Sequence, residues 1–415
     1  MRSVYSKYGD KVEVATFFAE SLMNLAPWKL WTRYPEYKEG IPETGELVKV
    51  LENALKQSPQ HPGLCHFYIH AMELSATPEK ALPCANVFRD TVKDYGHLIH
   101  MASHIDMWIG HYQQAMEVNQ LAIEADKRYM LTSKVENNFY KVGRMHTIHS
   151  AIWAAMFIGQ FGKSLQLTEG ILEYLTKEAI TCKIGEVPIG TMFLEPMRVI
   201  IWEVLVRFGK WEDIVKRPIE QDKDLYPSSI AMSRYARAVA YAALGKVAEA
   251  EVERDLFYES LKDKSLAERF LLNNIMYDPE QLGKGILDVA ESVLNGEIEY
   301  RKGNYHQAFD HLRLAVKRDA SLIYDEPWSW MMPTRHVLGA LLLEHGDFQE
   351  AEAVYREDLI NYKDNMWSLL GLHQTLKAQN KLEEAKSIFE KYQKASVYAD
   401  IKVGASCLCA SKMCS

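Results

Sequence analysis

Half of the chain's histidines fall in three predicted helices, always three or four residues apart. These residues are His66, His70, His97, His100, His104, His146 and His149. Positions three and four apart share one face of an α-helix, so we refer to this set as the histidine stripe. Neutral imidazole is a common transition-metal ligand, and a pair four residues apart presents two nitrogens to one ion. The spacing therefore indicates a ligand-binding surface.

Three interpretations of the histidine stripe remain open. In the first, a divalent transition metal (Zn, Cu or Fe) is bound by His66, His70, His100 and His104, on neighbouring helices about 8–10 Å apart. In the second, partly protonated histidines hold an acidic or phosphorylated ligand. In the third, the histidines are packing residues that hydrogen-bond to one another and to the backbone. The first two interpretations require the stripe to face a solvent-filled groove.

Several further residues are candidates for the lining of the same groove. Glu73 lies one helical turn beyond His70, and His61 directly precedes that helix. The segment Tyr324–Trp330 contains adjacent acids and cannot be helical, because Pro327 and Pro333 interrupt it. It is either a loop that closes over the groove or an insertion whose tryptophans pack on helix ends. The predicted groove residues besides the metal ligands are His61, Glu73, His97, His146, His149, Asp325, Glu326, Arg335 and His336.

Other chemistry-bearing patterns are missing from the sequence. It contains no GxGxxG, P-loop or GxSxG motif, and its HxxxH pairs lack the glutamate of a metalloprotease. The net charge of −8 argues against nucleic acid or an anionic membrane as a partner held by bulk electrostatics. No apolar run reaches the roughly 18 residues of a membrane span. The N-terminus has no signal-peptide core, and the six cysteines are scattered. Together with the features above, this predicts a cytoplasmic protein.

A short phrase repeats along the chain and predicts the architecture that positions these residues. In six copies it consists of Gly, one residue, an apolar or aromatic residue, two residues, and then a small or apolar residue. A weaker seventh copy has Asn380 in place of the Gly, and the first two units align without it. The final positions of nine copies are Leu47, Ala81, Ala115, Ser164, Ile214, Ala250, Ala308, Ala351 and Ala385. Successive copies are 34 residues apart at both ends of the series. This is the period of the tetratricopeptide (TPR) helix pair, with Gly in the turn between its helices.

The repeats predict an all-α chain, because almost no alternating strand pattern is present. Helix pairs of this kind stack into one continuous core. We therefore expect residues 1–415 to form a single TPR-like α-solenoid, a right-handed superhelix of about nine helix pairs. Longer spacings predict loop insertions near 176–196, 217–230, 260–285 and 319–333. Residues 400–415 are expected to be a flexible tail.

The chain resembles a family of TPR-repeat proteins of bacteria and some eukaryotes. The resemblance covers nearly the whole sequence and is carried by HPGLCHFYIHAMELS (61–75), GHLIHMASHI (96–105), MHTIHSAIWAAM (145–156) and YDEPWSW (324–330). It implies a TPR α-solenoid whose pattern includes the histidine stripe, and it supplies no reaction. TPR co-chaperones that grip acidic peptides are similar in fold only, because His66, His70 and Met101 stand where their Lys and Asn clamp would be.

Two classes of function follow as expectations. The first is a binding or scaffold protein that holds a peptide, a partner protein or a small molecule in the concave groove. The second is a metal-dependent enzyme or metal-binding protein built on the histidines. Fold alone does not choose between them.

Overall fold

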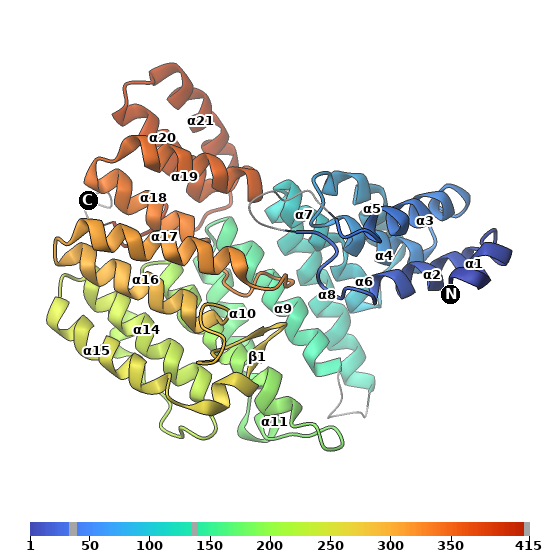
Figure 1. Cartoon of the computed structure of the whole chain (residues 1–415), viewed down its shortest axis with the longest axis horizontal. Coiled ribbons are helices and arrows are strands. Elements are labelled where there is room, and N and C mark those ends of the chain that lie inside the picture. Colours follow the sequence, from blue (N-terminus) through green and yellow to red (C-terminus); the bar gives the residue numbers. More distant parts are fainter. Residues whose placement is uncertain (33–39, 134–139, 411–415) are drawn as a thin grey trace. The chain divides into compact units, whose positions relative to one another are not determined.

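The computed structural model of the chain describes residues 1–32, 40–133 and 140–410, and these are overwhelmingly helical. Consecutive helices pack against each other as pairs along the chain. The predicted all-α, TPR-like arrangement of helix pairs is therefore confirmed. Two compact units emerge, which we call the N-terminal unit (Met1–Glu136 with His146–Ala151) and the C-terminal unit (Asn137–Met145 with Ile152–Ser415). The ribbon of each is coloured along the sequence in Figure 1. The single solenoid over 1–415 stays a prediction.

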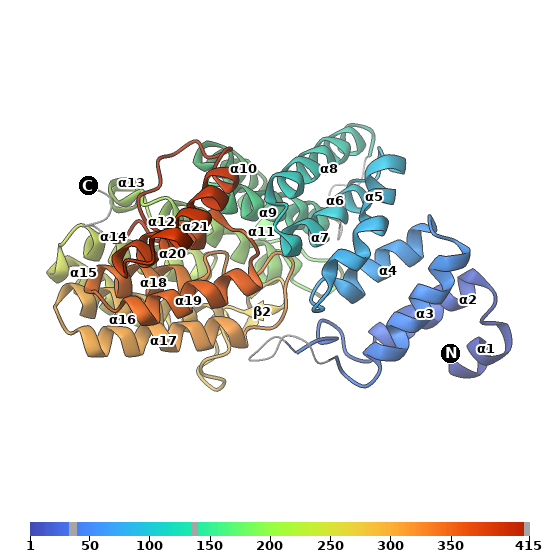
Figure 2. The same ribbon diagram turned by 90° about the horizontal axis from the view of Figure 1, so that it is seen from above.

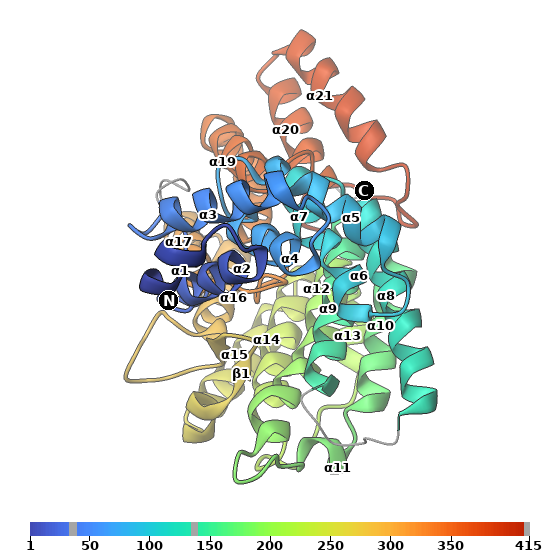
Figure 3. The same ribbon diagram turned by 90° about the vertical axis from the view of Figure 1, so that its right-hand side faces the viewer.

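The N-terminal unit is a series of short helices around one apolar core. Its elements are α1 (Arg2–Tyr8), α2 (Val12–Met23), α3 (Thr44–Gln57), α4 (Pro62–Met72), the 3₁₀ turn η1 (Pro78–Ala81), α5 (Leu82–Thr91), α6 (Gly96–His100), α7 (Ala102–Ile109), α8 (Tyr112–Thr132) and part of α9 (Tyr140–Phe157). Helices α2, α3 and α4 pack in succession, as Figure 3 shows. Phe18, Leu51 and Ile69 are among the buried residues that join them.

The C-terminal unit contains longer helix pairs. Its helices are the ends of α9, α10 (Phe161–Tyr174), α11 (Lys177–Ile180), η2 (Gly190–Leu194), η3 (Pro196–Val199), α12 (Ile200–Arg207), α13 (Trp211–Lys216), α14 (Pro227–Ala243), α15 (Val247–Ser260), η4 (Lys264–Glu268), α16 (Ile286–Arg301), α17 (Tyr305–Ser321), α18 (Thr334–His345), α19 (Phe348–Asn361), α20 (Met366–Ala378) and α21 (Leu382–Ala395). The strongest pairs are α14 with α15, α16 with α17, α18 with α19 and α20 with α21. Figure 2 shows α16 and α17 side by side.

The turns between paired helices have the conformation that the repeat phrase predicts. Gly110 ends α7 with a φ of 86°, and Gly346 ends α18 with a φ of 106°. The predicted turn residues with positive φ are Gly110, Gly159, Gly209, Gly245, Gly303, Gly346 and Asn380. A left-handed residue after a helix C-terminus reverses the chain, and glycine adopts it without a Cβ clash. The phrase therefore marks real turns between helices.

The small or apolar residue of each repeat is buried, as close helix packing requires. Its exposed fraction is zero in eight copies and 2% in Ala385. The eight fully buried residues are Leu47, Ala81, Ala115, Ser164, Ile214, Ala250, Ala308 and Ala351. A larger side chain in most of these positions would push the two helices of a pair apart.

Irregular segments occupy much of the predicted insertions. Residues 181–188 lack a helix, as do 217–226 and 322–333. Within 260–285 the chain forms η4 and an antiparallel hairpin of β1 (Phe270–Leu271) and β2 (Asn274–Ile275). This two-stranded pair is the only named sheet in the described residues.

The C-terminal residues differ from the expected flexible tail. Ser406 is fully buried, and its hydroxyl lies 2.7 Å from the Tyr355 hydroxyl and donates to the His336 carbonyl over 2.8 Å. Gln374 donates to the carbonyl of Gly404 over 2.8 Å. Side chains of α19 and α20 therefore hold Gly404 and Ser406 in place, and of the expected tail residues 411–415 lie outside the described residues. No described helix has the length and apolar character needed to cross a bilayer.

Candidate metal centre

Glu73 is the residue around which the predicted histidines assemble. It caps the C-terminus of α4 and is 2% exposed. One carboxylate oxygen, Oε1, lies 3.0 Å from Nδ1 of His70 on the same helix. The other, Oε2, lies 2.8 Å from Nδ1 of His104 on α7. A single buried carboxylate thus fixes two imidazole rings from helices that are adjacent in space.

His100 is held by a different polar group. It ends α6, and Met101 separates this short helix from α7. Its Nδ1 lies 2.6 Å from Oδ1 of Asn119 on α8. The Asn119 amide nitrogen donates to the carbonyl of Ala115 over 2.8 Å, so the amide oxygen faces the imidazole. Asn119 therefore orients His100 as Glu73 orients His104.

The remaining ring nitrogens meet in pairs. Nε2 of His100 lies 2.8 Å from Nε2 of His104, and Nε2 of His66 lies 3.2 Å from Nε2 of His70. Nε2 of His97 is 3.3 Å from that of His66. These contacts link five of the seven stripe residues directly, and Glu73 joins the two pairs.

His146 on α9 completes the assembly. Its ring centroid is 4.5 Å from that of His100 and 6.0 Å from that of His104. One nitrogen from each of these three rings lies within 4.8 Å of the others, a separation that a metal ion could bridge. We call the six interacting rings the histidine cluster: His66, His70, His97, His100, His104 and His146.

The cluster is more buried than the expectation of a solvent-facing stripe implied. His97 is exposed and His66, His70 and His146 are half-buried. His100 and His104 are only 1% and 6% exposed, so the expectation is wrong for these two residues. The cause is the packing of α6, α7 and α8, which places this part of the stripe between helices.

Burial makes the charged imidazolium unfavourable in the cluster. It lowers the pKa of His66 to about 2, with a further contribution from the neighbouring His70 and His97. Burial and the neighbouring histidines also lower the pKa values of His100 and His146 well below the usual range. These three rings are therefore neutral at pH 7, which is the protonation state that a metal ligand needs.

Two stripe-associated residues have other surroundings. His149 on α9 is fully buried, and neither of its ring nitrogens has a hydrogen-bond partner among the described residues. His61 is the N-cap of α4, where its Nδ1 accepts from the Leu64 amide over 3.2 Å and its Nε2 lies 3.1 Å from Glu13. The contacts of His61 are thus those of a capping residue.

The acidic loop residues belong to the C-terminal unit. Asp325 is buried and accepts from the Asn273 backbone over 2.9 Å and from the Asn274 amide over 2.6 Å, which ties the loop to the β1–β2 turn. Glu326 is also buried. Trp328 donates to Asp319 over 2.6 Å from a fully buried position. The tryptophans of this segment are packed, as the alternative interpretation of the loop predicted.

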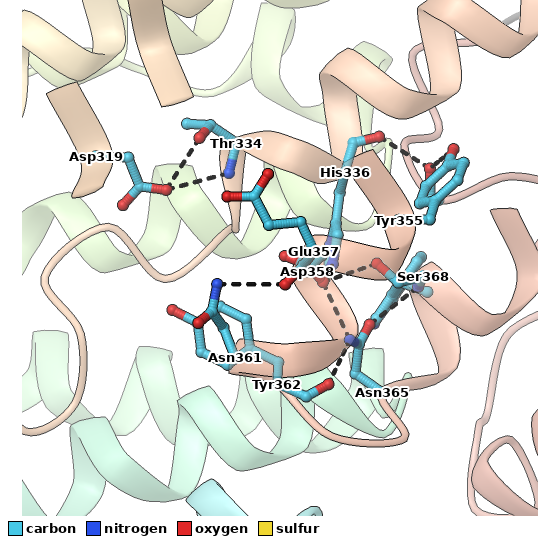
Figure 4. A network of polar contacts seen from close by, with 12 residues as sticks. Asp319, Thr334, His336, Tyr355, Glu357, Asp358, Asn361, Tyr362, Asn365 and Ser368 are labelled. Carbon is cyan, nitrogen blue, oxygen red and sulfur yellow. Dashed lines mark hydrogen bonds and ion pairs between the residues drawn. The ribbon is translucent and has the colours of Figure 1, made fainter. Parts of the chain in front are cut away.

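Arg335 and His336 belong to a second polar network, and Figure 4 labels His336 and its partners. Arg335 pairs with Glu357, and Nε2 of His336 lies 2.9 Å from Oδ2 of Asp358. The same carboxylate oxygen accepts from the Ser368 hydroxyl over 2.7 Å and from the Asn365 amide over 3.1 Å. This network ties α18, α19 and α20 together within the C-terminal unit.

Sequence reasoning named Glu73 but missed Asn119 and Asp358, the partners that orient His100 and His336. Asn119 on α8 and Asp358 on α19 are polar residues that are fully buried, at positions where the other inward-facing residues are mostly apolar. A polar residue at an inward helical position is a usable signal, because it needs a buried partner. The partner itself could not be read from the sequence, since Asn119 lies 19 residues from His100 and Asp358 lies 22 from His336.

No protein-family model and no curated protein matches the chain. Solved structures match most of its length. The Rap protein complexed with competence and sporulation factor is 10% identical over 94% of this chain and 89% of that chain, with a TM-score of 0.40. The human IFIT1 dimer with m7Gppp-AAAA is 12% identical over 93% and 72%, with a TM-score of 0.36. The P58(IPK) TPR domain is 14% identical over 92% of both chains, with a TM-score of 0.24. Likeness at this level carries no argument about function.

Proposed function

We propose that this helical-repeat chain is a binding protein whose ligand site is the histidine cluster. The ligand that the geometry supports best is a divalent transition metal, held by His100, His104 and His146. This set differs from the four ligands that the sequence spacing favoured, because one nitrogen each of His100, His104 and His146 lies within 4.8 Å of the others, whereas Nδ1 of His70 and Nδ1 of His104 both contact Glu73.

The hydrogen bonds at Nδ1 determine where the ring protons lie. A carboxylate only accepts hydrogen bonds, so Glu73 requires Nδ1–H on both His70 and His104. The Asn119 amide oxygen likewise requires Nδ1–H on His100. A neutral imidazole carries one proton, so Nε2 of each of these rings bears a lone pair.

Two of these lone pairs face each other. The Nε2 atoms of His100 and His104 are 2.8 Å apart, a distance at which two acceptors need a cation between them. A proton would satisfy the pair only by charging one ring, and burial lowers the pKa of His100 well below the usual range. A metal ion satisfies both lone pairs without protonating either ring. This facing pair is the observation that carries the proposal.

The donor set also indicates the class of metal. Imidazole nitrogen suits Zn, Cu, Ni and Fe, whereas Mg and Ca prefer oxygen. Two nitrogens on a tetrahedral zinc lie about 3.3 Å apart when each bond is about 2.0 Å, so the His100 and His104 rings would separate by about half an ångström on loading. Ligating histidines commonly donate their second nitrogen to a carboxylate or an amide, as His104 and His100 do here.

The scaffold interpretation is compatible with this metal centre. Three protein ligands leave a fourth position for water or for a donor group of a partner. A peptide, protein or small molecule that offers such a group would bind at the loaded cluster, while stacked helix pairs supply the surrounding surface. No reaction is assigned to the centre.

Metal analysis of the purified protein tests the proposal. We expect about one equivalent of zinc, copper or iron after purification without chelators. Titration calorimetry of metal-stripped protein should then show one site for Zn²⁺ or Cu²⁺. His104→Asn should remove this site, and His306→Asn, which changes an exposed histidine of α17, should leave it intact.

A packed-histidine role predicts a different outcome. His104→Asn would then lower the melting temperature, because Glu73 loses a partner, but the parent protein would bind no metal. Stability alone does not separate the two roles, since His104 is buried in either case. Absence of metal from the parent protein, together with no calorimetric site, would reject the metal proposal.

A further inference from the structure

The C-terminal segment 403–410 places two cysteines against buried charges of the C-terminal unit. Arg207 on α12 donates to the carbonyl of Ser406 over 3.3 Å, and Arg301 on α16 donates to that of Cys409 over 2.5 Å. Leu408 packs against Gly209, where even a Cβ would lie 2.8 Å from the leucine side chain. Helices α12 and α16 therefore fix the backbone on both sides of Cys407.

The two cysteines are joined by a disulfide but differ in their surroundings. Cys409 is 1% exposed, whereas Cys407 is half-buried. Cys407 lines a cavity of about 40 Å³ that also touches Arg207, Trp330 and His336. Its sulfur accepts the backbone N–H of Cys409 over 3.2 Å. An N–H donor and a nearby cation both stabilise a thiolate, so Cys407 has the setting of an attacking thiol.

Glu297 on α16 supplies the third group. It is fully buried, and neither carboxyl oxygen has a hydrogen-bond partner among the described residues. One of its oxygens lies within 4.8 Å of both sulfurs. The nearest cation is Arg301, 3.5 Å from the Glu297 carboxylate. Arg301 also pairs with a second carboxylate, that of Glu344, over 3.7 Å. Burial raises the pKa of Glu297 above the ordinary value of a carboxyl, which makes the carboxylate a better proton acceptor.

The bridge is poorly suited to a purely structural role. It connects residues two apart, and the stabilisation from a disulfide falls as the loop that it closes becomes shorter. The hydrogen bonds to Arg207, Arg301 and Tyr355 already hold the segment without it. The Glu297 carboxyl is likewise unexplained by packing, because a buried carboxyl whose oxygens accept no hydrogen bond among the described residues costs free energy, even with Arg301 3.5 Å away.

We propose that Cys407, Cys409 and Glu297 form a dithiol–disulfide exchange centre for small thiols and disulfides. The inference is independent of the metal centre in the N-terminal unit. Its substrate class follows from the exposure of Cys407, whose half-buried sulfur a small flexible disulfide reaches more readily than a folded protein does.

The exchange balances as a two-electron transfer. In the reduced centre, the Cys407 thiolate attacks one sulfur of a substrate R–S–S–R′, the substrate S–S bond breaks, and R′S⁻ leaves and takes a proton from water. The carboxylate of Glu297 then takes the proton of Cys409. The resulting thiolate attacks Cys407, the mixed disulfide breaks, and RS⁻ leaves with the proton of Glu297. The substrate is reduced to two thiols, and the protein gains the Cys407–Cys409 disulfide.

The test uses the full chain with Cys182 and Cys414 replaced by serine as the background, so that the other thiols are the buried Cys65 and Cys84. The reduced background protein is mixed with glutathione disulfide. We expect reoxidation of one dithiol per chain. Cys409→Ser should trap a glutathione adduct on Cys407, visible by intact mass, whereas Cys407→Ser should form at least tenfold less adduct. Circular dichroism of each variant checks that it remains folded.

Glu297→Gln separates a proton-transfer role from a packing role. The variant should form the mixed disulfide at the background rate but resolve it at least tenfold more slowly, with a weaker dependence on pH. Arg301, Glu344, Arg207, His336 and Tyr235 surround this carboxyl or its cavity, so their charges set the pH at which it acts.

Three results would overturn the proposal. One is a folded, reduced Cys409→Ser protein that forms no adduct. Another is equal slowing of both steps by Glu297→Gln. The third is a reduced background protein that retains a metal on its two thiols and resists oxidation. If a variant fails to fold, the rate at which Cys407 is alkylated in the reduced background protein tests the proposal instead. The proposal requires this rate to exceed the alkylation rates of Cys65 and Cys84 at least tenfold, and a smaller ratio would overturn it.

Discussion

Glu73 and His104 face each other across two helices, with the carboxylate Oε2 2.8 Å from the imidazole Nδ1 and both residues almost fully buried. The same carboxylate holds His70 over 3.0 Å. These contacts require Nδ1–H on both His70 and His104, so Nε2 of each neutral ring carries the lone pair. A change at Glu73 should therefore affect every property of the cluster.

Glu73→Gln should weaken metal binding 10- to 100-fold without removing a ligand, the range that is typical of partners beyond the ligands themselves. The amide offers one acceptor and one donor, so His70 or His104 must change tautomer. Titration calorimetry with Zn²⁺ measures the change. Glu20→Gln on the exposed face of α2 is the control. Unchanged affinity in Glu73→Gln would show that the carboxylate does not orient a ligand.

His149→Leu should leave the free energy of unfolding unchanged or raise it by about 1 kcal/mol. Both ring nitrogens of His149 are buried without partners, so the substitution removes a desolvation cost and no hydrogen bond. His100→Leu should instead destabilise the protein, because Asn119 then loses its partner. Urea unfolding of the two variants gives the comparison. A strong loss of stability in His149→Leu would mean that His149 has a polar role.

Acid should destabilise the metal-free protein below about pH 6.5, the ordinary pKa of histidine. Burial lowers the pKa of His149 to about 3, so the unfolded chain binds a proton that the folded chain refuses. This contribution to stability is complete above pH 6.5 and falls as the pH drops toward 3, by on the order of 1 kcal/mol per pH unit. Urea unfolding at pH 7.5, 6.5 and 5.5 measures the slope.

The buried carboxyl of Glu195, in the C-terminal unit, should make stability depend on pH in the opposite direction. Burial raises its pKa to about 7, so its contribution is complete below about 4.5 and is lost as the pH rises through 7. The two contributions oppose each other between about pH 4.5 and 6.5, so the loss of stability on acidification should become shallower in His149→Leu and steeper in Glu195→Gln. An acid slope that is the same in His149→Leu and the parent protein would contradict the assignment to His149.

Gly339→Ala in α18 should destabilise the chain by about 1–3 kcal/mol. A Cβ at this position would lie 2.6 Å from Cζ of Tyr355, so the ring must move and strain its bond with Ser406. Gly170→Ala in α10 is the matched control, since no atom lies within 4 Å of its Cβ position. The control should gain up to about 1 kcal/mol from helix propensity. Equal melting temperatures for the two variants would rule out tight packing at Tyr355.

The repeat phrase was sufficient to predict the helix pairs, because it records local requirements. A reversal after a helix needs a residue that tolerates positive φ, and a close helix pair needs a small or well-packed side chain at the crossing. Gly346 and Ala351 satisfy both requirements within six residues of sequence. Spacing alone also placed His100 and His104 on one face.

Tertiary structure decided the partners and the burial of those residues. Spacing grouped His66, His70, His100 and His104 around one ion, but Glu73 accepts from one ring of each pair, and His146 from α9 is a neighbour of His100 that the spacing did not include. The segment expected to be a free tail is held by Arg207, Gln374 and Tyr355. Contacts of this kind join residues up to about 200 positions apart, and they depend on how helices stack, which a single sequence does not encode locally.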